Sequence, residues 1–226
     1  TSPADEPTSA PAPRRRAARG ATAASAAERG RVNDPDRTMA NILEVATSEF
    51  ADKGLAGARI DEIAELTHTS KRMIYYYFGS KEGLYLAVLE EAYRRIRQIE
   101  TSLRLEDMEP EAALRALVGF TFDYQLGNPE FIRLVMNENM HRGEFIRRSA
   151  TIQELNVPAI HAVQAVYERG VASGAFRPHM DPIDLHMSIS ALCFFNVANR
   201  HTFSAIFKRS LDEPSALAQR RDSIID

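Results

Sequence analysis

The chain has 226 residues, of which 44% are hydrophobic and 26% are charged, so it is long enough to bury a core of ordinary size. Its formal net charge of −3 excludes a chain that is basic throughout, and any contact with nucleic acid must come from a local patch. No run approaches the roughly 20 continuous apolar residues of a membrane-spanning helix, and the single cysteine, Cys193, excludes an internal disulfide and fits a reducing cytoplasm.

The first 35 residues are rich in Ala, Pro, Ser and Arg, with Val32 as the exceptional large apolar residue. Such a segment cannot bury enough surface to offset its ordering entropy, which predicts a disordered arm over residues 1–35. It carries a group of arginines: Arg14, Arg15, Arg16 and Arg19. These favour either an arm that tracks DNA or enters a minor groove, or a solvated tail, and no apolar run follows them to suggest an export signal.

Helical periodicity begins at Arg37. Apolar residues recur at three- and four-residue spacing and predict a first helix: Met39, Ile42, Leu43, Ala46 and Phe50. Gly54 is expected to end this helix. A second, short helix is expected over residues 60–67, and Ser70 is a candidate N-cap for a third over residues 71–77.

Helices are expected to continue to the end of the chain. Ser80 is expected to cap a fourth helix, which continues for several turns until residues 107–110 break it. Later segments also have helical periodicity: residues 111–126, 129–141, 144–173, 181–201 and 202–209, the last ending there or continuing past Pro214. Pro158 is expected to kink or restart the helix near Asn156. Because the sequence lacks strand alternation and hairpin turns, the expected fold class is all-α.

The two short helices, separated by three residues, suit a helix-turn-helix, in which the second helix lies in the major groove of DNA. No acidic residue lies between Glu65 and Glu82. The same window contains the basic residues Lys71, Arg72 and Lys81. DNA favours such a window because its phosphates repel carboxylates. Arg72 could donate two hydrogen bonds to a guanine, and Lys71 could reach a guanine or a phosphate.

Three consecutive tyrosines, Tyr75, Tyr76 and Tyr77, offer hydroxyls for phosphates and ring edges for thymine methyl groups. Successive residues point about 100° apart on a helix, so one tyrosine is expected to face the core beside Ile74 and Phe78. Short adjacent helices also occur in proteins that bind no DNA, and tyrosines are common packing residues. The spacing alone therefore leaves both interpretations open.

Four segments resemble the N-terminal DNA-binding domain of the tetracycline repressor (TetR) family: ILEVA at 42–46, FADKG at 50–54, IDEIA at 60–64 and SKRMIYYYFGSKEGL at 70–84. The resemblance covers residues 37–90. It implies a helix-turn-helix DNA-binding domain over residues 36–82 (the head) and a helical ligand-binding and dimerisation domain over residues 83–226 (the body). It further implies a homodimeric transcription factor, more often a repressor than an activator, that binds a pseudo-palindromic operator and is released by a small-molecule effector.

The resemblance places the family's base-reading positions at Lys71, Arg72 and Tyr75, after the cap Ser70. Its phosphate-contacting positions fall on Tyr76, Tyr77, Lys81 and the start of the second helix near Arg59. The sequence departs from the family pattern at three places: His68 replaces a turn glycine, Arg72-Met73 replaces Gly-Thr, and Ala58-Arg59 replaces a Thr or Ser. Histidine tolerates positive φ better than most residues, so His68 is expected to keep the turn. Which bases are read stays open.

The body carries no motif that defines a ligand. Candidate contacts are polar residues that interrupt apolar helical faces and aromatic residues beside them: Phe120, Tyr124, Asn137, His141, Phe194 and Asn196. The alternative for each is a place in the core or on the surface. An effector bound here is expected to bias the helix that starts at Ser80, because this helix links the body to the head.

The helix over residues 184–199 is apolar nearly all round and needs cover on most sides, which a second subunit would supply. The resemblance likewise implies that the last two body helices form the dimer face. Cys193 lies in this helix and is expected to be a buried, inert thiol. No membrane partner is expected.

Parts of the sequence also suit two other classes of protein, a helical metalloenzyme and a helical scaffold. Glu138 and His141 form a Glu-x-x-His pair, as in di-iron bundles, but the sequence has no second pair to complete such a site. The sequence also lacks the nucleophile-elbow, phosphate-loop and dinucleotide motifs, so no catalytic residue, metal or cofactor is expected. The other alternative is a helical scaffold that binds a protein partner without DNA, and the acid-free basic window argues against it.

Overall fold

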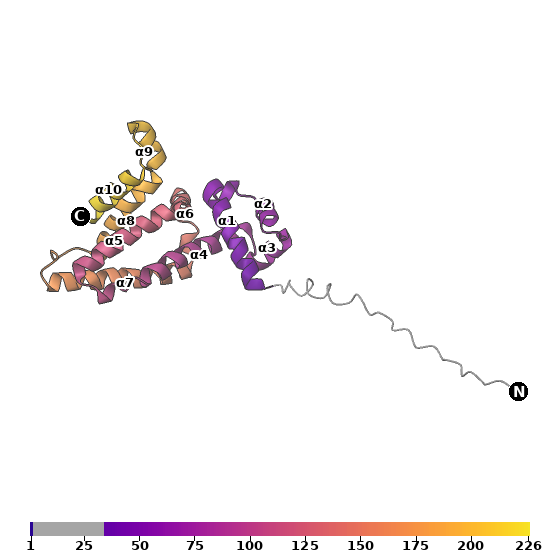
Figure 1. Ribbon diagram of the computed structural model, residues 1–226, viewed down its shortest axis with the longest axis horizontal. Coiled ribbons are helices and arrows are strands. Elements are labelled where there is room, and N and C mark those ends of the chain that lie inside the picture. Colours follow the sequence, from indigo (N-terminus) through magenta and orange to yellow (C-terminus); the bar gives the residue numbers. More distant parts are fainter. Residues whose placement is uncertain (2–33) are drawn as a thin grey trace. The chain divides into compact units, whose positions relative to one another are not determined.

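The computed structural model describes Thr1 and residues 34–226. The expected disordered arm, with its arginine group, therefore lies outside the described residues except at its ends. The residues from Asp36 to Asp226 form one compact unit. Its helices are α1 Pro35–Gly57, α2 Ile60–Leu66, α3 Lys71–Phe78, α4 Lys81–Thr101, α5 Pro110–Gly127, α6 Pro129–Met140, α7 Ala150–Ala172, α8 Pro182–Ala198, α9 Arg200–Phe207 and α10 Pro214–Ile225 (Figure 1). No strand occurs in the described residues, which confirms the all-α fold class.

Helix α1 places its apolar face against the centre of the head. Ile42, Ala46 and Phe50 are fully buried, as their spacing predicts. Gly54 has φ 65° and breaks the helical backbone, so the chain turns there before the short segment that ends at Gly57. Gly54 therefore breaks α1 where its end was expected, although a short helical segment continues to Gly57.

The turn between α2 and α3 forms as the sequence predicts. His68 adopts φ 51° at the position where the resemblance implies a glycine. The Ser70 hydroxyl accepts a hydrogen bond from the Met73 backbone N–H at 3.2 Å and so caps α3. Ile74 is fully buried and fixes the face of α3 that packs into the core.

Helix α4 connects the head to the body. The Ser80 hydroxyl accepts from the Gly83 N–H at 3.0 Å, which confirms the predicted cap. Gly83 is required by packing, because a Cβ there would lie 2.0 Å from the Phe78 carbonyl oxygen. The helix ends at Thr101, earlier than expected, because Arg104 takes a left-handed conformation and starts the 3₁₀ turn Leu105–Asp107.

The helix α7 differs from the prediction at its start and at Pro158. It begins at Ala150, because the preceding residues form the 3₁₀ turn Ile146–Arg148 and Ser149 caps the helix by accepting from Ile152 N–H. The expected restart near Asn156 was wrong, since α7 continues through Pro158 to Ala172. Proline removes one backbone hydrogen bond, and the packing of α7 against α4, α5 and α8 outweighs that loss.

The C-terminal residues form two short helices. Helix α8 ends at Ala198, and α9 begins at Arg200, two residues before the expected start. Helix α10 is a separate helix that packs on α5. Arg221 of α10 donates bidentate hydrogen bonds to the Asp123 carboxylate of α5 at 2.9–3.1 Å. The extension past Pro214 is therefore a new helix, which covers part of a buried apolar cluster in the body that includes Leu117 and Phe122.

Candidate nucleic-acid interface and ligand cavity

Helix α3 leaves one polar and aromatic face open to solvent. Arg72 is exposed, and Tyr75 and Tyr76 are 43% and 77% exposed. Tyr77 is half-buried against the core and contacts Phe78 edge-on, so it is the tyrosine that faces inward. The structure thus separates three adjacent tyrosines into two exposed rings and one packing ring.

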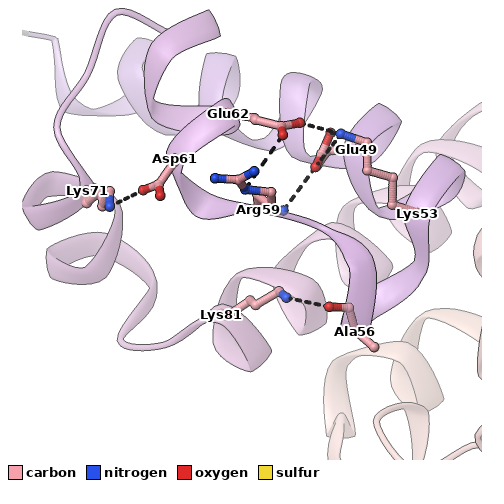
Figure 2. A network of polar contacts seen from close by, with 8 residues as sticks. All are labelled: Glu49, Lys53, Ala56, Arg59, Asp61, Glu62, Lys71 and Lys81. Carbon is pink, nitrogen blue, oxygen red and sulfur yellow. Dashed lines mark hydrogen bonds and ion pairs between the residues drawn. The ribbon is translucent and has the colours of Figure 1, made fainter.

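Three of the candidate basic residues are held by contacts within the head (Figure 2). Lys71 forms an ion pair with Asp61, and Arg59 lies 3.7 Å from Glu62. The Lys81 ammonium donates to the Ala56 carbonyl at 3.4 Å. Arg72 makes no ion pair or hydrogen bond within the residues that the structure describes, so its guanidinium is available to an external acceptor.

The pair between Lys71 and Asp61 is a feature that the sequence pattern missed. Asp61 lies outside the acid-free window in sequence, but the turn brings it beside the start of α3. Both side chains are about half exposed, and exposed pairs contribute only about 0–1 kcal/mol. Lys71 can therefore leave Asp61 for another anionic partner at little cost.

At the start of α2, where the Thr or Ser of the family pattern is missing, a carboxylate from α1 binds one backbone N–H group. The buried Glu49 carboxylate, from α1, accepts the Arg59 backbone N–H at 2.9 Å (Figure 2). Lys53 bridges Glu49 and Glu62, and its hydrogen bond to Glu62 holds the pKa of that carboxyl below its usual value. The exposed Arg59 guanidinium thus lies near the start of α2, beside Glu62.

The body contains a cavity of about 460 Å³. Its walls come from α4, α5, α6, α7 and α8, with one residue of the 3₁₀ turn before α7. Half of the lining residues are aromatic or aliphatic: Tyr93, Ile96, Phe120, Phe131, Val135, Ile146, Ile152 and Phe194. Phe120 and Phe194 are the two sequence-predicted ligand residues that line it.

The other four candidates lie elsewhere. Tyr124 is buried with its ring against Phe131, outside the lining. Asn137 donates from Nδ2 to the Phe50 carbonyl at 3.2 Å and so faces the head. His141 is exposed at the end of α6. Asn196 borders a separate groove of about 370 Å³ beside α9 and α10.

Polar residues that the sequence pattern did not indicate also line the cavity. Arg97 on α4 pairs with Glu100, and both side chains are at least 88% buried. Burial raises the pKa of Glu100, opposed by Arg97, and burial together with Arg97 lowers the pKa of His186. The apolar positions next to Arg97 predicted the helix α4 itself. That Arg97 faces a cavity becomes visible only when the five helices are assembled.

Of the two residues of the Glu-x-x-His pair, Glu138 has a structural role. Glu138 is 1% exposed and accepts the backbone N–H groups of Phe145 and Ile146 at 3.2 and 3.1 Å. It therefore fixes the turn before α7 rather than facing His141. Within the described residues, no group of three or more His, Cys, Asp or Glu side chains is placed to hold a metal ion. None of the described helices is long and apolar enough to cross a membrane.

A head with an exposed recognition helix, joined to a helical body with a cavity, defines the class of one-component transcriptional regulators. Residues 42–88 match the profile of the bacterial regulatory proteins of the tetR family, and residues 110–226 match the tetracyclin repressor-like C-terminal domain. The chain therefore belongs to the TetR family of transcriptional regulators.

Relatives and solved structures agree with this assignment. The HTH-type transcriptional repressor NicS of Pseudomonas putida is 40% identical over 188 residues, which are 83% of this chain and 89% of NicS. The repressor SCO4008 of Streptomyces coelicolor is 36% identical over 143 residues, covering 63% of this chain and 71% of that protein. The structure of AibR with isovaleryl coenzyme A and operator DNA shares the fold, with a TM-score of 0.61 and 20% identity over 83% of this chain and 96% of AibR.

Proposed function

We propose that the protein is a homodimeric repressor that binds a pseudo-palindromic operator through α3 and leaves it when a small molecule fills the body cavity. The exposed face of α3 carries the proposal, because Arg72, Tyr75 and Tyr76 project from a helix that Ile74 anchors. The relatives NicS and SCO4008 are named repressors, which supports repression over activation. Such a protein acts where the chromosome lies, in the cytoplasm.

The same proposal assigns roles to the other basic residues around α3. Lys71 and Arg72 would read base edges with Tyr75, and the cap residue Ser70 would hold the first turn of α3 against the groove. Tyr76, Lys81 and Arg59 would contact phosphates on either side. Tyr77 is half-buried, so only its hydroxyl could serve this purpose.

An exposed apolar surface on α8 and α9 supports the dimer. Large hydrophobic side chains are 45–71% exposed there: Ile183, Met187, Leu192, Phe195, Ile206 and Phe207. Exposed apolar surface of this extent on two neighbouring helices marks a protein interface. A two-fold axis through α8 and α9 would place two copies of α3 on one DNA duplex.

Helices α4 and α6 connect the cavity to the head. Helix α4 carries Tyr85, which is buried in the same core as Phe50, and Arg97, which lies in the cavity wall. Helix α6 turns Phe131 toward the cavity and Arg133, two residues later, toward Asp52 of α1, with which it pairs. Two residues are about 200° apart on a helix, so opposite faces of α6 contact the cavity and the head. A ligand that shifts either helix would change the separation of the two α3 helices.

Selection of bound duplexes from random DNA with the full chain tests the proposal. We expect an inverted repeat whose half-sites lie about one helical turn apart or slightly more. Native mass measurement should find two chains on each selected duplex. Ile206→Asp, which places a charge on the exposed α9 face, should give monomers that no longer enrich the repeat. Enrichment of unrelated sequences, or an unrepeated site bound by one chain, would contradict the proposal.

A further inference from the structure

The cavity combines apolar walls with hydrogen-bonding atoms that have no partner. Arg97 Nε, Gln125 Oε1 and His186 Nδ1 are buried and unpaired among the described residues, and all three side chains line the same cavity. They come from α4, α5 and α8, so no local backbone geometry accounts for their gathering. Buried polar groups in folded proteins are almost always paired. Three exceptions in one cavity indicate a ligand with several polar atoms.

Arg97 determines which hydrogen-bonding group this ligand must present. Its Nη1 is paired with Glu100, which leaves the Nε edge without an acceptor. A guanidinium is always protonated and only donates, whereas a glutamine amide can flip and a histidine can change tautomer. Arg97 therefore fixes an acceptor on the ligand, while Gln125 and His186 can adapt to either a donor or an acceptor.

A carboxylate is the acceptor that suits this edge best, because two oxygens match two guanidinium N–H groups in one plane. The charged side chains of the cavity wall are Arg97 and Glu100, which neutralise each other, and the lowered pKa of His186 favours its neutral form. An arriving anion would meet donors from Arg97, and from His186 and Gln125 in their adapted forms. An arriving cation would meet Arg97 and an acid that is already paired.

We infer that the cavity binds a compact carboxylic acid with an apolar or aromatic body, its carboxylate held by the Nε edge of Arg97. The volume of about 460 Å³ and the rings of Phe120, Phe131 and Phe194 set the size and apolar character of that body. The inference rests on the proposed function for the role of the cavity as the effector site, but the binding chemistry stands on the cavity itself.

Acids and their primary amides of nearly equal shape provide the test. The full chain is titrated by calorimetry, and its melting temperature followed, with benzoate against benzamide and with hexanoate against hexanamide. We expect the acid of at least one pair to bind at least about tenfold more tightly than its amide, as a charge-assisted hydrogen bond predicts. Amides that bind as well as the acids would overturn the inference. So would the absence of binding by all four compounds at concentrations up to about 1 mM, the upper end of typical KM values.

Three variants separate the carboxylate contact from general effects on folding. Glu100→Gln removes the competing acid and should tighten acid binding several-fold while leaving amide binding unchanged. The double variant Arg97→Gln with Glu100→Gln keeps a neutral pair of similar size in the wall and should lose the preference for acids. Arg94→Gln, on the same helix with a partly exposed side chain paired to Glu91, is the control and should change neither. Weaker acid binding by Glu100→Gln would contradict the inference.

Operator affinity measured on the selected duplex separates this inference from the proposed function. Acid binding that depends on Arg97 but leaves operator affinity unchanged would support the cavity chemistry and refute the effector role. If instead the chain binds an inverted-repeat operator but binds acids no more tightly than amides, the inference is refuted and the DNA-binding proposal stands.

Discussion

The head and the body of this protein bury their side chains in different ways. In the head, Ile42, Phe50, Ile63 and Ile74 are fully buried in a filled core. In the body, half-buried aromatic side chains surround a cavity of about 460 Å³. The core of the head is filled and continues into α4, where Leu84 and Tyr85 are fully buried with it, whereas the helices of the body leave between them a space that a ligand could fill.

The largest expected effect contrasts one phenylalanine from each region. Phe50 is fully buried, and its ring packs edge-on against Tyr85 with the centroids 5.1 Å apart. Phe50→Ala should lower the free energy of unfolding by about 3–5 kcal/mol, because the filled core cannot close the cavity that the truncation creates. Phe194→Ala should cost only about 1–2 kcal/mol, since its ring is half-buried and already borders open space.

Chemical denaturation of both variants, compared at unchanged m-values, measures this difference. Equal losses from the two substitutions would show that the body is packed as tightly as the head. The cavity would then be too small in solution to admit a ligand without rearrangement.

The next effect concerns DNA. Arg72→Ala should weaken specific operator binding by about 1–3 kcal/mol, because it removes the guanidinium best placed to fork onto a base. Fluorescence anisotropy over a range of salt concentrations measures this loss, and preference at one operator position should relax. Arg104→Ala removes an exposed arginine from the body and is the control. If Arg72→Ala left operator affinity and base preference unchanged, the placement of α3 in the major groove would be wrong.

The sequence predicted most of the head because its signals are local. The caps Ser70 and Ser80, the break at Gly54 and the turn at His68 each depend on residues a few positions apart, and the structure confirms all four. The ion pair between Lys71 and Asp61 was missed for the opposite reason. It joins two helices across a turn, and only the folded backbone shows that the acid lies beside the base.

The ligand cavity could not be predicted in the same way. Its lining comes from five helices spread over about a hundred residues, and no motif relates Arg97 on α4 to His186 on α8. Phe120 and Phe194 line it, but periodicity cannot distinguish a cavity wall from a core. Asn137 looked like a polar interruption of an apolar face, and the structure instead turns its amide toward the backbone of α1.

The smallest expected effect concerns Asn137, which contacts the head and not the cavity of the body. Asn137→Ala removes the hydrogen bond to the Phe50 carbonyl and should lower the free energy of unfolding by about 0.5–1.5 kcal/mol. Benzoate affinity, measured by calorimetry, should stay within about twofold, because the side chain lies outside the cavity lining. Asn139→Ala, whose amide bonds only within α6, is the matched control. A loss of benzoate binding of about tenfold or more in Asn137→Ala would make it a ligand contact, as its sequence position first suggested.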